Sequence, residues 1–330
     1  MSDSDDMRDL RGKTLAITGA TGFLGAHLVL AGLAAGATVR AVVRTPSKAS
    51  WLADLGVEVA KADLSDIPAM TRAFSGADVI IANAARTVAK GGTFADSLRD
   101  NRDGADNQLV AASDAGVQRV VYISTIAVYA TRLLCKTTES APMRNPDRRP
   151  TDIGAYTSSP QYARSKAAAE VAVWERATQR GMQVTSLRPG PIYGPGWSRL
   201  NQRYRDWSHS RVSVLPTFRF PHVHAADCAE TVIRAIQNAS SVGEVFNLAG
   251  PLASPYGVVG ALTKLRGAGP LRLPLLAPVW IGLDDSKAER LLGRPLRRIE
   301  DNVQDLLTDD VVSDRCQQLY SALQPPSGPE

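Results

Sequence analysis

A tyrosine and a lysine four residues apart are the best candidates in this chain for moving a proton. Tyr162 and Lys166 lie in "QYARSKAAAE", residues 161–170, whose alanines favour a helix. A spacing of four places both side chains on one helical face. Because an unperturbed tyrosine has a pKa of about 10, a phenol that exchanges protons near neutral pH needs a positive charge nearby. The pattern alone is also common on surface helices.

Two hydroxyl residues at the end of an apolar run make the pair more specific. "VVYISTIAVY" carries Ser124 and Thr125 where a buried strand is expected to end. Ligands of open parallel sheets bind at the carboxyl ends of the strands. A hydroxyl there could hold a substrate carbonyl while Tyr162 gives or takes a proton, and either residue could supply it.

Three glycines near the N-terminus predict a nucleotide site. Gly19, Gly22 and Gly25 stand between an apolar run and a helix-forming segment in "TLAITGATGFLGAHL". Glycines in this position permit a tight turn and a close approach of backbone N–H groups to a pyrophosphate, which the helix N-terminus also favours.

Charges at the ends of the next two apolar runs bear on which dinucleotide binds. Arg44, with Ser47 and Lys48, follows "TVRAVV", where an NAD site usually has an acidic residue. A guanidinium can hold a 2′-phosphate, so NADP is predicted and NAD is less favoured; the alternative is a solvated strand-end charge. Asp63 and Leu64 follow the third run, and Asp63 could accept from an adenine amino group or cap a helix.

Positioning these residues requires an alternation of strands and helices. Seven short apolar runs, "KTLAIT", "TVRAVV", "VEVAKAD", "ADVIIANAA", "QRVVYIST", "QVTSLRP" and "EVFNLAG", alternate with alanine-rich segments over most of the chain. Such runs are typical of a parallel sheet covered on both faces. The fold class predicted is therefore α/β, with a doubly wound parallel sheet and a smaller C-terminal substrate-binding region.

Domain limits follow from the same pattern. We expect a flexible N-terminus over 1–12, an NADP-binding domain with the catalytic residues over 13–190, a mainly substrate-binding region with returning sheet segments over 191–320, and a disordered tail over 321–330. Residues 130–161 are rich in Pro, Arg, Thr and Ser and read as a long inserted loop. It could be a lid over the substrate or a surface excursion. Helices are expected at 161–180 and about 300–310.

Taken in order, the motifs resemble those of the extended short-chain dehydrogenase/reductases, the NAD(P)-dependent epimerase/dehydratase family. The resemblance runs from "TGATGFLG" through "YARSKAAAE" and "LRPGPIYGPG" to "DDSKAERLLGRP". It implies a Rossmann fold, with Thr125 orienting the substrate, Tyr162 as general acid/base, and Lys166 lowering the tyrosine pKa and holding the nicotinamide ribose. It also implies that Asn101 supports the lysine and a proton-relay water. Aligning the following "VY" favours Thr125 over Ser124.

The resemblance implies further binding residues. Those expected to contact the cofactor, besides the charged residues above, are Gly19, Thr21, Gly22, Phe23, Leu24, Gly25, Asn83, Ala84, Ala85, Pro189 and Ile192. Those expected near the substrate are Arg86, Thr125, Tyr193 and Trp197. "ANAA" at 82–85 departs from the usual "HxAA", which leaves the contacts of Asn83 open.

Several reactions could use such a centre. A dehydratase is disfavoured because Ile126-Ala127 replace the Asp-Glu that related dehydratases carry, and a nucleotide-sugar epimerase because Gly190 stands where those enzymes often have asparagine. The favoured reading is an NADP-dependent reductase or dehydrogenase acting on a carbonyl or secondary alcohol, similar to dihydroflavonol reductases or 3-beta-hydroxysteroid dehydrogenases. The alternatives are a sugar epimerase or ketoreductase, and a non-catalytic NADP-binding regulator.

The composition limits the classes of partner that the chain is expected to bind. The 330 residues contain 38 basic and 33 acidic side chains, a net charge of +5, without a basic run that would follow phosphates. No stretch is apolar enough to span a bilayer. A cytoplasmic protein with a small-molecule substrate is expected, with no nucleic acid or membrane partner, and the family habit suggests a homodimer. Three scattered cysteines and the pair His222 and His224 read as structural residues, so no metal is expected.

Overall fold

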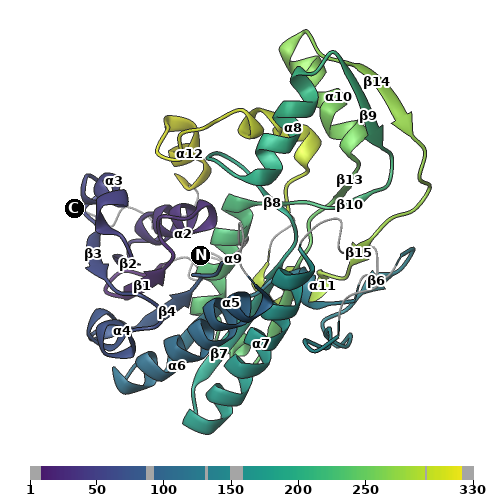
Figure 1. Cartoon of the computed structure of the whole chain (residues 1–330). Coiled ribbons are helices and arrows are strands. Elements are labelled where there is room, and N and C mark those ends of the chain that lie inside the picture. The colour runs from purple at the N-terminus through teal and green to yellow at the C-terminus, as the bar shows by residue number, and fades with distance from the viewer. Residues whose placement is uncertain (1–8, 87–92, 131–132, 149–158, 294–295, 322–330) are drawn as a thin grey trace.

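A seven-stranded parallel sheet forms the centre of the molecule in the computed structural model, which describes residues 9–86, 93–130, 133–148, 159–293 and 296–321 (Figure 1). The strand order is β12-β7-β5-β4-β1-β2-β3. The strands are β1 (Thr14–Thr18), β2 (Thr38–Val43), β3 (Glu58–Lys61), β4 (Val79–Ala82), β5 (Arg119–Ile123), β7 (Gln183–Pro189) and β12 (Val245–Leu248). All seven predicted runs therefore form strands of one sheet, and the predicted fold class is confirmed.

Helices cover both faces of this sheet, as its apolar strands require. One face is covered by α2 (Phe23–Ala34) and α9 (Ala225–Gln237), which pack against each other, with α11 (Ser286–Leu292) beside β12. The other face is covered by α4 (Ile67–Phe74), α6 (Gly104–Asp114) and α7 (Pro160–Arg180). Side chains therefore alternate between two cores along each strand: Val121 and Ile123 of β5 belong to the first core, and Val120 and Tyr122 to the second.

A smaller layer lies beyond the carboxyl ends of the strands (Figure 1). It contains α8 (Arg199–His209), β9 (Val212–Pro216), α10 (Pro255–Arg266), β14 (Leu271–Leu275) and the 3₁₀ segment η6 (Ile299–Leu306). Their buried side chains, including Tyr204, Leu215 and Val259, form a separate core. Helix α9 and strand β12 return from this part of the chain to the large sheet.

Short strand pairs join distant segments. β8 (Ile192–Tyr193) pairs with β11 (Val223–His224), β10 (Phe220–Pro221) with β13 (Leu252–Ala253), and β6 (Lys136–Thr137) with β15 (Gly282–Leu283). The last pair attaches the inserted loop to the C-terminal part of the chain.

Three expectations need correction. Leu10 is fully buried and its N–H bonds to the carbonyl of Ala35, so residues 9–12 are not a flexible end. The helix expected at 300–310 is the 3₁₀ segment η6, kinked at Asn302. The described part of the 130–161 loop includes strand β6 and is no free excursion; 1–8, 131–132, 149–158 and 322–330 lie outside the described residues.

None of the helices in the described ranges is both long and apolar enough to cross a bilayer.

Candidate active site

The glycine turn has the shape that a dinucleotide phosphate requires. Gly19 follows β1 with a φ of 65°, which favours glycine. A Cβ at Gly25 would lie 2.0 Å from the carbonyl oxygen of Gly19, so helix α2 can approach the turn only without a side chain there. Gly22 is the N-cap residue of α2, and no side chain forms a capping hydrogen bond there. Thr21 is exposed beside this end. The turn therefore fits a pyrophosphate held by backbone N–H groups.

Opposite charges meet at the ends of β2 and β3. Arg44 and Lys48 are exposed directly after β2. Asp63 accepts hydrogen bonds from the backbone N–H and the hydroxyl of Ser65, both of which lower the Asp63 pKa, and Arg44 lowers it further. Asp63 does not cap the following helix, because Asp66 does so. Leu64 packs against Gly104 of α6.

Helix α7 brings Tyr162 close to Thr125. Its N-cap Ser159 accepts a bond from the N–H of Tyr162 at 3.1 Å, and Pro160 occupies the first turn. Tyr162 thus lies at the start of the helix, where its phenol hydrogen-bonds with the Thr125 side chain. Burial raises the pKa of Tyr162 to about 12, and the bond with Thr125 acts in the opposite direction. The phenol is therefore protonated at neutral pH.

Ser124 differs from Thr125 in its contacts and in its exposure. Its hydroxyl is buried and donates to the carboxylate of Glu170 at 2.5 Å. Thr125 is partly exposed, and its oxygen accepts from the N–H of Ala127 at 3.2 Å. Thr125 is therefore the hydroxyl of the two that remains accessible.

Lys166 bonds to groups that the sequence analysis did not consider. Its Nζ donates to the hydroxyl of Tyr122 at 2.7 Å and to the carbonyl of Ile123 at 2.9 Å. Burial lowers the pKa of Lys166 to about 7, and Glu170 opposes this shift. Tyr122 belongs to β5 and is fully buried, which raises the pKa of its hydroxyl. Burial dominates the pKa of Tyr162 here, and the expected effect of Lys166 on that pKa stays a prediction.

Asn101 contacts the helix next to the lysine and not the lysine itself. It lies in a π-helical turn, η2 (Arg99–Asp103), a distortion often found at functional sites. Its Nδ2 donates to the hydroxyl of Ser165 at 2.8 Å and to the carbonyl of Arg86 at 3.1 Å. Its Oδ1 accepts from the Arg86 N–H at 2.7 Å. The asparagine thus fixes the chain after β4 against α7.

The chain after β4 borders the glycine turn. Asn83 donates through Nδ2 to the carbonyl of Gly19 at 3.4 Å, and the N–H groups of Asn83 and Ala84 each donate to the Thr18 hydroxyl at 3.0 Å. Ala85 is partly buried. Arg86 is exposed and paired with Asp100. These contacts are structural, and they place Asn83 and Ala84 beside the turn.

The remaining predicted residues divide between surface and core. Pro189 ends β7 and is buried, whereas Ile192 is partly exposed in β8. Phe23 packs edge-on against His27, and Leu24 belongs to the core. Trp197 is 64% exposed. Tyr193 is fully buried against His224, so the expectation that it contacts substrate does not fit this structure.

A buried ion pair joins α7 to strand β7 of the large sheet. Glu170, at the turn after Lys166, pairs with Arg188 of β7 at 2.8 Å, and both are almost completely buried. Ser124 and Ser186 also donate to Glu170. The signal available in the sequence was a carboxylate on the helical face of Tyr162 and Lys166, opposite an arginine in an apolar strand.

The two histidines act structurally. His222 bonds to the hydroxyl of Tyr204 at 2.7 Å, and His224 to Asp305 at 3.2 Å. Among the described residues, no group of three possible ligands could hold a metal ion.

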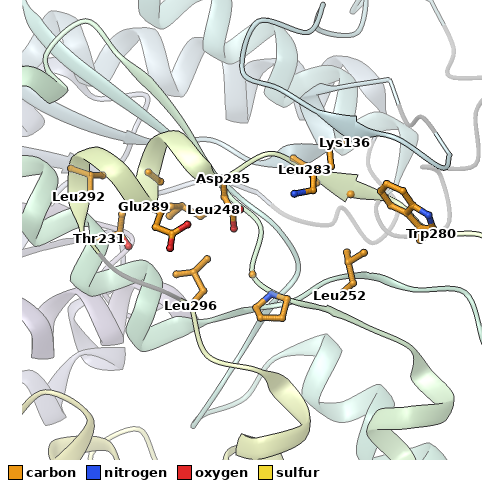
Figure 2. Close-up of a pocket in the computed structure, with 14 residues that line it drawn as sticks. Lys136, Thr231, Leu248, Leu252, Trp280, Leu283, Asp285, Glu289, Leu292 and Leu296 are labelled. Carbon is orange, nitrogen blue, oxygen red and sulfur yellow. The ribbon is translucent and has the colours of Figure 1, made fainter.

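A cavity of about 340 Å³ lies beside the edge of the large sheet. It is lined by Lys136 of the inserted loop together with Trp280, Leu283 and Asp285 from the C-terminal part. Figure 2 shows Asp285 between Glu289 of α11 and Lys136. Burial raises the pKa of Asp285. Two segments expected to shape the substrate region thus share a cavity, but neither Thr125 nor Tyr162 lines it.

Comparisons with known proteins identify the family of this chain. Residues 15–249 match the model of the NAD dependent epimerase/dehydratase family. The chain is 28% identical over 292 residues to "Sterol demethylase protein B" of Methylococcus capsulatus, covering 86% of this chain and 82% of that protein. It is 34% identical over 229 residues to "Ceramide reductase" of Caulobacter vibrioides, covering 68% of this chain and 61% of that protein.

A solved structure, that of the yeast methylglyoxal/isovaleraldehyde reductase Gre2 complexed with NADPH, has a TM-score of 0.77 with 19% identity and covers 89% of this chain and 97% of that chain. At this identity the likeness concerns the fold alone. With the glycine turn, the Tyr162 and Lys166 helix and a family match over most of its length, the chain belongs to the NAD-dependent epimerase/dehydratase family, the extended short-chain dehydrogenase/reductases, enzymes that act on CH–OH and C=O groups.

Proposed function

We propose that the protein is an NADP-dependent reductase or dehydrogenase that interconverts a carbonyl and a secondary alcohol on an apolar organic substrate. The observation that carries this proposal is the bond between Tyr162 and Thr125 beside the buried Lys166. The names of the relatives above, a ceramide reductase and a sterol demethylase protein, support an apolar substrate.

The chain's own residues account for the proton. Thr125 holds the carbonyl oxygen through its hydroxyl, and Tyr162, protonated at neutral pH, donates a proton to that oxygen as it becomes an alcohol. When bound, the nicotinamide supplies or accepts the hydride. Lys166 holds positive charge near the resulting phenolate, and Asn101 keeps α7 in place through Ser165. In the reverse direction the phenolate removes the proton.

The test is turnover of NADPH with a panel of aromatic and lipidic ketones. Tyr162→Phe should reduce kcat by about 10²- to 10⁴-fold, with NADPH affinity changed little because the glycine turn is intact. Tyr256→Phe, on α10 and away from this centre, is the matched control. Equal turnover by Tyr162→Phe would contradict the assignment. A wild type that binds NADPH tightly but reduces no carbonyl would favour a regulator.

The NADP preference rests on Arg44 and has its own experiment. Arg44 is exposed directly after β2, the strand that pairs with β1, and Lys48 follows in η1. Titration with NADPH and NADH should show an NADPH preference that Arg44→Ala removes, whereas Arg180→Ala at the far end of α7 should keep it. A preference for NADH, or NAD retained on purification, would instead favour a nucleotide-sugar epimerase.

A further inference from the structure

Strands β9 and β14 form a two-stranded parallel sheet with one apolar face turned to solvent. Val212 is the register partner of Leu271, and Val214 is the partner of Leu273, so the four side chains lie on the same side. They are between 44% and 64% exposed. Leu275, opposite Pro216, extends the row. We call these five residues, Val212, Val214, Leu271, Leu273 and Leu275, the β9–β14 face.

The opposite side of the same sheet is packed except at Pro274, which is exposed. Ser213 and Leu215 are buried, and Leu215 belongs to the core shared with α10. Arg272 lies over the ring of Tyr256 and donates to its carbonyl at 3.1 Å. In a two-stranded sheet supported on one side, the outer positions are normally polar, so the apolar outer row is not required by this fold.

Exposed large apolar side chains are concentrated on and beside the β9–β14 face. Among the described residues, eleven large hydrophobic side chains are exposed, and six of them are the β9–β14 face and Leu276, which is 80% exposed. Figure 1 shows β9 and β14 at the outer edge of the smaller layer, away from the large sheet. A contiguous patch of this kind indicates an interaction site more often than chance exposure.

The segments around the β9–β14 face are strongly basic. Residues 199–219 and 255–281 contain eight basic and one acidic side chain, which leaves 30 basic and 32 acidic in the rest of the chain. Arg211 directly precedes β9, and Lys264 and Arg266 precede β14; all three are exposed. Because the two strands are parallel, these charges gather at the same end of the sheet.

An apolar row with a positive margin fits an anionic lipid bilayer better than a second protein chain. Pro216 and Pro274 remove N–H donors from the two strands, which hinders pairing with an added strand. A second copy of this chain would bring the same positive margin against its own. Anionic headgroups instead attract such charges, while the leucines and valines enter the acyl boundary.

We propose that the protein attaches to the surface of membranes that contain anionic lipids, with the β9–β14 face inserted and Arg211, Lys264 and Arg266 on the headgroups. This attachment does not depend on the proposed reaction, because the β9–β14 face contains none of the predicted catalytic residues. It goes beyond the expectation of no membrane partner, which considered only spanning segments.

The experiment is sedimentation of the full-length protein with vesicles of phosphatidylcholine, with or without phosphatidylglycerol. The wild type should sediment with the anionic vesicles and be released by high salt. Leu271→Ser with Leu273→Ser should lower the partition coefficient at least tenfold. Arg211→Gln with Lys264→Gln should lower it by about fivefold for each charge. Val242→Ser and Arg180→Gln, on other surfaces, are the matched controls and should bind as the wild type does.

Folding and cofactor binding are checked on each variant by thermal unfolding and NADPH titration, and should be unchanged. Failure of the wild type to bind anionic vesicles would overturn the proposal, as would equal binding by the leucine variant. A wild-type dimer in light scattering that the leucine variant converts to a monomer, without vesicle binding, would assign the β9–β14 face to a second copy instead. Loss of activity alone would bear on the proposed reaction and not on this attachment.

Discussion

At the scale of single residues, Tyr122 is the residue that the sequence analysis missed. It accepts a hydrogen bond from Lys166 at 2.7 Å inside the second core of the sheet. Burial lowers the pKa of Lys166. Because a hydrogen bond to a charged group stabilises the charged form, we expect Tyr122 to favour the protonated lysine. We regard Tyr122 as a positioning residue that sets the place and charge of Lys166.

Tyr122→Phe should move the pH dependence of the reaction. Losing a hydrogen bond worth about 1.5 to 3 kcal/mol should lower the Lys166 pKa by about one to two units. The limb of the kcat/KM profile that reports the ionisation of Lys166 should therefore shift to lower pH. NADPH affinity should change little. Tyr256→Phe is the control. If Tyr122→Phe only lowers stability and leaves the profile in place, Tyr122 is a packing residue.

Lys166 also makes stability depend on pH. Its pKa is about 7 in the folded protein and about 10.5 when unfolded, so the unfolded chain binds more protons between these values. The folded protein is therefore most stable with respect to Lys166 above about pH 10.5, and this stability is lost as the pH falls to about 7. Urea unfolding at pH 7 and 9.5 should show Lys166→Met gaining stability over the wild type at pH 7 and less at pH 9.5. A constant difference would contradict the low pKa.

At the scale of elements, the Glu170 and Arg188 pair joins four segments. Glu170 comes from α7 and Arg188 from β7, while Ser124 follows β5. Arg188 also donates to the carbonyl of Glu139 in the inserted loop and to the hydroxyl of Tyr129. The helix that carries Tyr162 is thus fixed to the sheet and to the loop by one buried network.

Glu170→Gln should destabilise the protein strongly. It leaves the Arg188 charge buried without its carboxylate, which costs about 3 to 5 kcal/mol. Replacing both residues with methionine should recover part of this loss, since no charge is then left unpaired. Urea unfolding at pH 7 measures both, with the exposed Glu175→Gln on the same helix as the control. A loss below about 1 kcal/mol would show that water reaches Arg188.

The sequence predicted the large elements well, because each of the seven strands is a local apolar run between helix formers. It could not predict the pairing of β6 with β15, since two-residue strands carry no periodic signal and their partners lie far apart in the chain. Tyr122 escaped for a related reason: in "VVYIST" it reads as one more buried strand residue, and only the packing of α7 brings Lys166 to its hydroxyl. The 3₁₀ geometry of η6 and its kink at Asn302 left no mark in the sequence that we could identify.

At the scale of the whole molecule, two buried histidines connect the layers. His27 of α2 bonds to the carbonyl of Pro195 through Nε2 at 2.8 Å and to the hydroxyl of Tyr320 through Nδ1. His222 bonds to Tyr204 of α8. Burial lowers the pKa of His27 to about 4 and that of His222 to about 3. Both are neutral in the folded protein under ordinary conditions.

The protein should therefore lose stability in mild acid. Each histidine contributes stability that is present above its unfolded pKa of about 6.5 and is lost as the pH falls through its folded value of about 4 or 3. Unfolding free energies measured from pH 7 to pH 4.5 should fall, and His27→Gln should flatten part of this slope. The exposed His209→Gln should leave it unchanged. An equal slope in His27→Gln would show that other groups control acid unfolding.

The pairing of β6 with β15 also has a consequence for biosynthesis. Thr137 stands opposite Leu283, and Asn247 donates to the carbonyls of Thr137 and Asp284. The inserted loop after Thr125 is therefore held by residues that are made much later. A chain emerging from the ribosome exposes the glycine turn and its first five strands well before those residues. The loop that follows Thr125 therefore emerges from the ribosome before the residues that hold it, and it can reach its final position only after β15 has been made.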